Sequence, residues 1–123
     1  MRLSIVIPTW NGLALLQKCL KSLEAQTWRD FEIVVSDDGS MDGTLDFLRV
    51  HYPDVLVERS EKNRGFVAAV NRGIGRTRGE WVFLLNNDVT LAADCLERLM
   101  EVAENNDAAM LTPLVLWTED TQL

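Results

Sequence analysis

Acidic and amide side chains gather in two short motifs of this sequence, and their types point to cation and ligand binding. Asp37 and Asp38 follow an apolar run and precede a Gly-Ser pair, while Asn86, Asn87 and Asp88 follow a second apolar run. A carboxylate beside amide oxygens is a hard oxygen site of the kind that holds Mg²⁺ or Mn²⁺ together with water and phosphate oxygens. Two adjacent carboxylates repel each other, a cost that is tolerated where one of them binds a ligand or faces a cation. The two motifs therefore predict a polar binding site.

Turn formation is the alternative explanation for the same residues. Asp and Ser side chains accept backbone N–H groups at the start of a helix, and Gly permits a positive φ. This explanation accounts for Ser40, Asp42 and Gly43, but it requires only one carboxylate. We therefore favour a functional role for Asp38 and leave Asp37 open. An Asx turn likewise remains the alternative at the second motif.

A basic segment lies between these motifs. Residues 63–65 are predicted to begin a helix, whose free N–H groups and positive dipole end attract anions, and the Arg64 guanidinium adds a bidentate phosphate donor. Six of the 12 Lys and Arg residues fall between positions 59 and 78. We interpret Arg72, Arg76 and Arg78 as a solvated helix face. We expect the residues at the start of the predicted helix, Lys62 to Arg64, to help bind an anionic ligand.

The elements that must position these residues alternate between strands and helices. Apolar, β-branched runs predict strands at residues 3–7, 31–35, 55–57, 81–85 and 108–116, and helix-period segments separate them. Because the strands show no polar alternation, we predict an α/β fold with an open, mostly parallel sheet and helices on both faces. Ligands of such sheets bind at the carboxyl ends of the strands, and all the polar motifs fall there.

Length and charge exclude several classes of function. The chain has 123 residues, enough for one domain with a core. Its net charge of -7 argues against a nucleic acid or an anionic membrane surface as a partner. No apolar run is long enough to span a membrane, and no signal peptide is recognised. Cys19 and Cys95 match no metal or redox spacing, so we expect buried thiols and a cytoplasmic location.

Four stretches together resemble the family 2 glycosyltransferases: residues 4–11, 35–44, 63–73 and 84–88. The Leu-Asn-Asn-Asp form of the last stretch is similar to the rhamnosyltransferase-like branch. The resemblance implies a Rossmann-like GT-A fold and transfer of a sugar, of hexosyl type, from a nucleoside diphosphate sugar, UDP- or dTDP-linked, to an acceptor hydroxyl with inversion. It also implies a divalent cation, Mg²⁺ or Mn²⁺, a glycan or lipid-linked acceptor, and a role in cell wall or polysaccharide biosynthesis.

The resemblance also implies roles for individual residues. The residues that would bind the donor are Pro8, Thr9, Trp10, Asp37, Asp38, Arg64 and Asn87. The first three would line the nucleobase pocket, the two aspartates would hydrogen-bond the base or ribose, and Asn87 would lie near the ribose or sugar. Asp88 would bind the metal that bridges the two phosphates. Asn86 and Asn87 replace acids that many relatives carry, so metal binding would depend on Asp88.

The general base that inversion requires is not recognisable in this sequence. The acids after Asp88 suit an exposed helix and none stands in a base motif. We therefore expect residues 1–123 to form a single nucleotide-sugar-binding domain, the amino-terminal part of a longer enzyme, with little or no activity alone. The alternative is a non-catalytic nucleotide-sugar-binding module that forms a homodimer through exposed apolar surface. Any attachment to a membrane would come from residues outside this chain.

Overall fold

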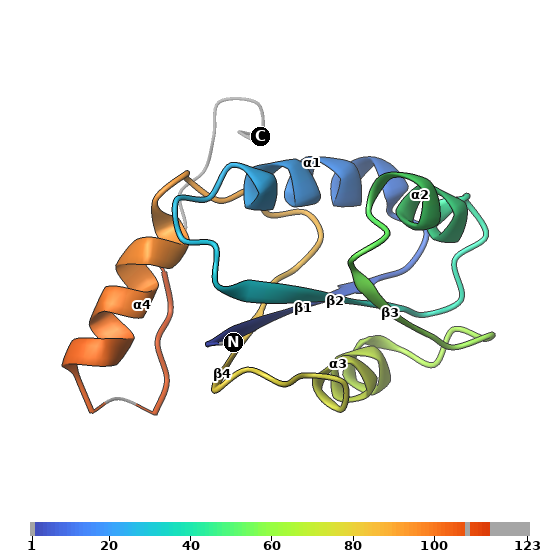
Figure 1. Cartoon of the computed structure of the whole chain (residues 1–123). Helices are drawn as coiled ribbons and strands as arrows, with labels where there is room; N and C mark the ends of the chain where they lie inside the picture. The colour runs from blue at the N-terminus through green and yellow to red at the C-terminus, as the bar shows by residue number, and fades with distance from the viewer. Residues whose placement is uncertain (1, 108, 114–123) are drawn as a thin grey trace, which may run out of the picture.

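The computed structural model describes residues 2–107 and 109–113. Strands and helices alternate along this part of the chain (Figure 1). The elements are β1 (Leu3–Thr9), α1 (Leu13–Glu24), β2 (Phe31–Asp37), α2 (Thr44–His51), β3 (Leu56–Arg59), α3 (Phe66–Ile74), β4 (Trp81–Leu84) and α4 (Cys95–Asn105). Within these described ranges, no helix has the length and apolar character needed to cross a membrane.

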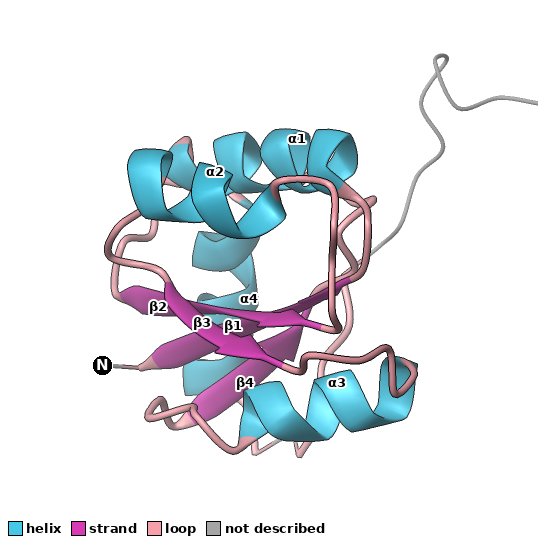
Figure 2. Ribbon diagram, turned by 90° about the vertical axis from the view of Figure 1, so that its right-hand side faces the viewer, coloured by secondary structure: helices cyan, strands magenta, loops and turns pink. Residues whose placement is uncertain are grey.

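The four described strands form one parallel sheet in the order β3-β2-β1-β4. β1 lies inside the sheet and pairs with β2 along its full length, from Leu3 beside Phe31 to Thr9 beside Asp37. Helices α1 and α2 cover one face of the sheet, and α3 covers the other (Figures 1 and 2). The predicted open parallel sheet with helices on both faces is confirmed, and double coverage explains why its strands read as continuous apolar runs.

The first two strands each end two residues later than the sequence predicts, so Pro8 lies inside β1. β4 pairs with β1 only as far as Val6, whose carbonyl accepts the Leu85 N–H at 2.9 Å. Residues two apart in a strand direct their backbone groups to the same neighbouring strand. The nitrogen of Pro8 therefore points to where β4 no longer pairs, and its missing N–H costs no ladder hydrogen bond.

The strand predicted at residues 108–116 is not found where the structure describes that segment. Residues 109–113 adopt no regular structure, and the rest of the segment lies outside the described residues. Residues 109–113 instead line an apolar groove of about 350 Å³ together with β4 and α4. Most of them stay exposed there, Met110 by 86%, so this segment covers the groove without becoming part of the core. The third strand also differs from the prediction, since it spans Leu56–Arg59 rather than residues 55–57.

The core is built on the helical spacing of α1. Leu16, Leu20 and Leu23 are fully buried and belong to one cluster with side chains of β1, β2 and α4. The buried side chain of Gln26 then joins the end of α1 to the start of α4, because its Oε1 accepts the Leu96 N–H at 3.0 Å. This bond satisfies one of the free N–H groups at the amino end of α4.

Helix α3 packs on the sheet through its small residues. Ala69 and Gly73 are buried, whereas Phe66 and Ile74, which the sequence places on the apolar face of this helix, are 56% and 41% exposed. The Ser36 hydroxyl in β2 donates to the Ala69 carbonyl at 2.6 Å, which brings the helix backbone close to the sheet. That close approach leaves no room for large side chains between α3 and the sheet.

The turn before β4, predicted as an ordinary surface turn, supplies the partner of a buried carboxylate. The Glu32 carboxylate, which is buried, accepts the Ser4 hydroxyl at 2.6 Å and the Arg78 backbone N–H at 2.7 Å. Arg78 Nε also donates to Glu32 at 3.0 Å. The Arg78 side chain is 67% exposed, as predicted, but it lies in a turn rather than on a helix face, and it neutralises a buried carboxylate at the amino edge of the sheet.

A methyl group at Gly73 should destabilise the fold. A Cβ there would lie 2.6 Å from Val6 Cγ1 and 3.2 Å from Ser36 Cβ. We expect Gly73→Ala to lower the free energy of unfolding by about 1–3 kcal/mol, measured by urea denaturation. Gly75→Ala is the matched control, because its Cβ would meet only ordinary contacts at 3.4 Å and beyond. Equal stabilities of the two variants would contradict the close packing of α3.

Candidate functional site

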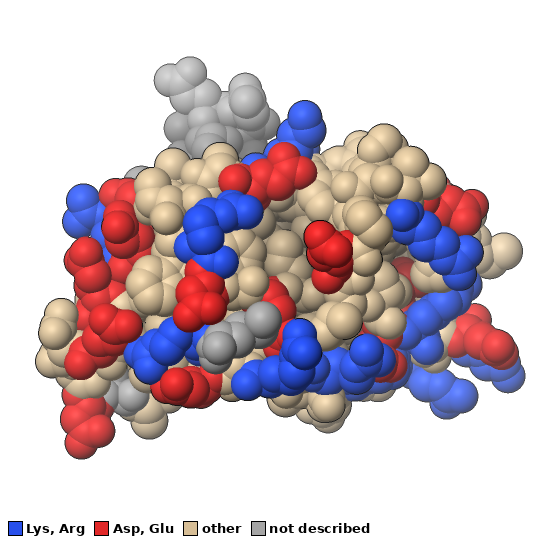
Figure 3. All heavy atoms as spheres, viewed as in Figure 1, with Lys and Arg blue, Asp and Glu red and all other residues tan. Residues whose placement is uncertain are grey.

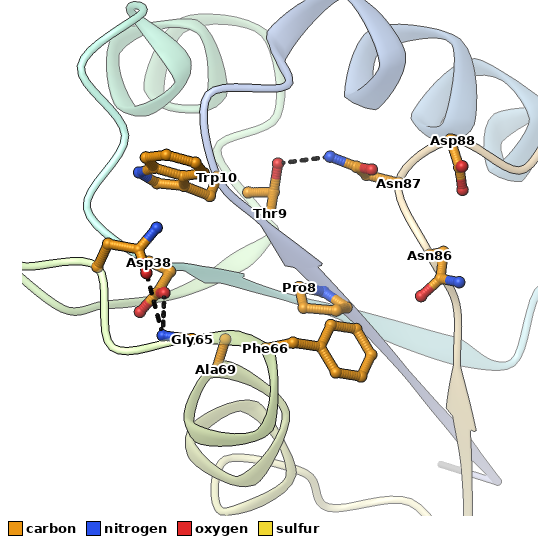
Figure 4. A pocket seen from close by; sticks show the side chains of 11 residues that line it. Pro8, Thr9, Trp10, Asp38, Gly65, Phe66, Ala69, Asn86, Asn87 and Asp88 are labelled. Carbon is orange, nitrogen blue, oxygen red and sulfur yellow. Dashed lines mark hydrogen bonds between the residues drawn. The ribbon is translucent and has the colours of Figure 1, made fainter.

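A cleft of about 410 Å³ opens at the carboxyl edge of the sheet (Figure 4). It is lined by Pro8, Thr9, Trp10, Asp38, Asn63, Gly65, Phe66, Ala69, Asn86, Asn87 and Asp88. The lining includes six of the residues singled out from the sequence: Pro8, Thr9, Trp10, Asp38, Asn87 and Asp88. Residues from the ends of three strands and from the start of α3 therefore meet in one place.

The sheet topology explains why the cleft forms at this position. From β1 the chain moves outward to β2 and β3, and it then returns to the other side of β1 as β4. In open parallel sheets the crevice lies where the strand order reverses, because the connections there leave in opposite directions. The cleft lies between the chain that follows β1 and the chain that follows β4 (Figure 4).

Asp38 forms one wall of the cleft and is held by three donors. The backbone N–H groups of Arg64 and Gly65 donate to its Oδ2 at 2.9 and 2.8 Å, and Arg72 Nη2 donates to its Oδ1 at 3.2 Å. Asp38 is only 3% exposed, and burial by itself would raise the pKa of its carboxyl. The two backbone N–H groups and the Arg72 guanidinium outweigh burial and hold that pKa below its ordinary value. Asp38 is therefore an ionised hydrogen-bond acceptor at neutral pH.

Asp37 does not line the cleft. Its side chain is fully buried, where it accepts the Ser40 backbone N–H at 3.2 Å and the Ser40 hydroxyl, and pairs with Arg59 at 3.2 Å. These contacts are those of the turn explanation considered for this residue. Because successive residues of a strand point to opposite sides, only one of the two adjacent aspartates can face the cleft.

Two loops are joined at the mouth of the cleft around Asn11. Its backbone N–H donates to the Ser40 hydroxyl oxygen at 2.8 Å, and its Oδ1 accepts the Met41 N–H at 2.8 Å. Asn11 has a φ of 49°, a left-handed conformation that asparagine tolerates better than most residues. The preceding residue, Trp10, is 53% exposed and presents its ring to the cleft. Asn11 thus fixes the loop that carries the aromatic wall.

The opposite wall carries amide and carboxylate groups from the chain after β4. Asn87 Nδ2 donates to the Thr9 hydroxyl at 2.9 Å, a bond that spans the two walls (Figure 4). Asp88 is exposed and makes no hydrogen bond or salt bridge to another described residue. Burial, followed by the charge of Asp88, raises the pKa of the Cys19 thiol to about 12, so this neighbouring cysteine stays protonated.

The donor set around Asp88 fits a hard divalent cation. Three or more His, Cys, Asp or Glu residues do not converge anywhere in residues 2–107 and 109–113, so an all-protein metal cage is absent from these ranges. Mg²⁺ is commonly held by one or two carboxylates, with water and ligand phosphates completing its octahedron. An unengaged carboxylate beside the Asn86 amide in an open cleft meets that requirement.

Most cations of the basic segment are engaged elsewhere. Arg59 and Arg72 pair with the two buried aspartates, and Arg76 pairs with Glu58. The prediction of Arg72 as solvated is therefore wrong, because its side chain is 21% exposed and pairs with a buried carboxylate, whereas Arg76 is exposed as predicted. Arg64 contributes its backbone N–H to Asp38, while its side chain is exposed and outside the lining of the cleft. On the face seen in Figure 3, acidic side chains gather over α4 and a belt of Lys and Arg runs along the edge beside α3.

The comparisons with known proteins agree with this geometry. The parallel sheet and its cleft define the chain as an α/β protein of the GT-A glycosyltransferase class. The sequence profile of glycosyl transferase family 2 matches residues 4–121, and the chain belongs to this family. It is 40% identical over 100 residues to the PGL/p-HBAD biosynthesis glycosyltransferase of Mycobacterium bovis, and the match covers 78% of this chain and 39% of the relative. The chain therefore spans about two fifths of the length of this relative.

Two solved structures show the same fold. One is S. aureus TarS 1-349 in complex with UDP-GlcNAc, with a TM-score of 0.79, 26% identity, and coverage of 85% of this chain and 32% of that one. The other is the mannosyltransferase PcManGT from Pyrobaculum calidifontis in complex with GDP-Man and Mn²⁺, with a TM-score of 0.73, 27% identity, and coverage of 81% and 31%.

The contribution of Asp38 to stability should depend on pH. Because its pKa is lowered in the folded chain, its ionised form stabilises the fold above the ordinary aspartate pKa of about 3.9, and this stabilisation is lost as the pH falls through that range. We expect the difference in unfolding free energy between the wild type and Asp38→Asn to be largest near neutral pH and to shrink below about pH 4. Urea denaturation across this range measures it.

Asp46→Asn is the control, because Asp46 is exposed on α2 and pairs only with Arg49 at 3.8 Å. This change should alter stability by less than about 0.5 kcal/mol at every pH. A difference for Asp38→Asn that stays constant from neutral to acidic pH would contradict the ionised state assigned to Asp38.

Proposed function

We propose that this chain binds a nucleoside diphosphate sugar in the cleft and serves as the donor domain of an inverting glycosyltransferase of hexosyl type. The observation that carries the proposal is that the two ends of the cleft differ in their chemistry. Trp10 and the ionised Asp38 lie at one end, and the unengaged Asp88 lies at the other (Figure 4). This arrangement suits a ligand with a flat, hydrogen-bonding base at one end and a diphosphate at the other.

The nucleoside end would be formed by Pro8, Thr9 and Trp10 together with Asp38. An exposed aromatic ring offers a stacking surface, and an ionised carboxylate selects an N–H or O–H group of the base or ribose. Asp37 would not contact the ligand but would fix the turn after β2 through its hydrogen bonds with Ser40. The complex of TarS with UDP-GlcNAc supports a nucleotide sugar, UDP- or dTDP-linked, as the ligand.

The diphosphate end would be formed by Asp88, with Asn87 near the ribose or sugar. Arg59, Arg72, Arg76 and Arg78 neutralise acids of the fold, and the other two cations of the basic segment, Lys62 and Arg64, do not line the cleft. We therefore propose that Asp88 holds Mg²⁺ or Mn²⁺, which when bound would neutralise the leaving diphosphate. The Mn²⁺ in the PcManGT complex supports this assignment. Arg64 could reach the donor only by turning its exposed side chain toward the cleft.

The general base would come from residues other than those described. Asp38 and Asp88 are the two carboxylates of the cleft lining, and one is engaged by the fold while the other is assigned to the metal. We propose that residues 1–123 are a single donor-binding domain from the amino-terminal part of a longer enzyme, as the 39% span of the mycobacterial relative supports. The lack of a third cleft carboxylate equally favours the second candidate, a non-catalytic nucleotide-sugar-binding module.

The remaining assignments follow the family. We propose a glycan or lipid-linked acceptor, as in cell wall or polysaccharide biosynthesis, and a cytoplasmic location, which the two free thiols support. A homodimer of this chain would use the apolar groove beside β4, where Val82 and Leu84 are exposed.

Calorimetric titration of UDP, dTDP and GDP sugars tests the donor site. At least one of them should bind the wild type, with an affinity about tenfold or more higher when Mn²⁺ is present. Asp88→Ala should remove this dependence on Mn²⁺, whereas Asp46→Ala, on the exposed surface of α2, should leave it unchanged. No binding of any of the three by a folded sample would exclude the proposed function, and Mn²⁺-dependent binding by Asp88→Ala would exclude the metal site.

Transfer itself should be at background in this chain. We expect UDP release from a bound UDP sugar, with simple alcohols as acceptors, to match the rate without protein, because no positioned base deprotonates the acceptor. The measurement is a coupled assay for free UDP, with a full-length relative as the positive control. Turnover comparable with that of the relative would contradict both the proposal that this chain lacks the general base and the proposal that it is a non-catalytic module.

A further inference from the structure

We propose that Arg72 is a positioning residue for nucleoside binding, which fixes the orientation and the charge of the Asp38 carboxylate at the cleft. The inference rests on the proposed function, since it concerns the same cleft. Arg72 itself does not line the cleft and would act only through Asp38.

Helix direction explains how Arg72 reaches the site. Arg72 lies in the last turn of α3, away from the carboxyl edge, but long helical side chains point back toward the amino end of their helix. Its Nη2 lies 3.2 Å from Asp38 Oδ1 and 3.5 Å from the Asp37 carbonyl oxygen. Arg72 Nε is buried and has no hydrogen-bond partner among the described residues, which is unfavourable. The guanidinium occupies this position because its Nη2 contacts Asp38.

The donors around Asp38 show what Arg72 contributes. The backbone N–H of Gly65 donates to Oδ2, and the backbone N–H of Arg64 donates to both oxygens, at 2.9 Å to Oδ2 and 3.1 Å to Oδ1. Arg72 Nη2 is the one side-chain donor to Asp38 among the described residues, and it approaches Oδ1 from the side of α3. Its removal would leave the backbone donors in place but would free one side of a carboxylate that lines the cleft.

The charges around Asp38 make Arg72 hard to replace. Asp37 is adjacent and buried, and its charge is already paired with Arg59 of β3. Lys62 and Arg64, in the loop before α3, are exposed and form no salt bridge with a described residue. Arg72 is the one guanidinium in contact with Asp38 among the described residues. Without it, two neighbouring buried carboxylates would share one cation, and Asp38 would take up a proton at higher pH.

The test compares Arg72→Met with Arg72→Lys, and uses Arg76→Met as the matched control. Arg76 follows the same helix but pairs with Glu58, away from the cleft. The first readout is the side-chain ¹³C shift of Asp38 titrated without ligand, and the second is UDP affinity by calorimetry between pH 8 and pH 5. Should Arg72→Met lose its cooperative thermal transition, Arg72→Gln takes its place in both measurements.

Arg72→Met should move the Asp38 titration to higher pH. Below that shifted midpoint, UDP affinity should fall by about tenfold for each further pH unit, as the ionised fraction does. Arg72→Lys should restore part of the wild-type curve, and Arg76→Met should follow the wild type. An unshifted Asp38 titration in Arg72→Met overturns the inference, whether or not UDP binds. A shifted titration with unchanged UDP affinity overturns the positioning role, whereas absence of UDP binding in the wild type counts against the proposed function alone.

Discussion

Two consecutive buried carboxylates at the end of β2 are the constraint around which the site is built. Asp37 and Asp38 are 0% and 3% exposed, and an unpaired charge in such a position costs several kcal/mol, about the stability margin of a small domain. Each carboxylate therefore has its own guanidinium, from β3 for Asp37 and from α3 for Asp38. The same two side chains accept N–H groups from the turn after β2 and from the loop before α3. The contacts that neutralise the two carboxylates thus also fix the turn after β2 and the loop before α3, which lie at the cleft.

This constraint also explains the distribution of charge. A segment rich in arginine beside a predicted anion site suggests phosphate binding, yet four of its arginines pair with acids of the fold. These arginines neutralise protein carboxylates, so a diphosphate in the proposed site would face Asp88 and amide groups instead. The excess of acids over bases is therefore a property of the cleft as well as of the whole chain. A divalent cation is the simplest means of balancing such a site.

Sequence patterns predicted the sheet, its coverage and the edge that carries the cleft, because these follow from apolar runs and from the rule for parallel strands. They favoured Asp38 but left Asp37 open, since the predicted strand stopped at residue 35 and the alternation of side chains was undefined beyond it. Arg72 was missed because its partner lies 34 residues earlier in the chain. One signal was available: Arg72 is three residues after Ala69 and next to Gly73, on the small-residue stripe that faces the sheet.

The proline in β1 has a consequence for motion. Pairing between β1 and β4 ends at Val6, and beyond Pro8 the two chains are joined by the bond between the Thr9 and Asn87 side chains. A strand ladder opens cooperatively, but a single side-chain bond exchanges with solvent or a ligand hydroxyl on its own. The bond that joins the two walls at the mouth of the cleft can therefore break without breaking any bond of the strand ladder beneath it.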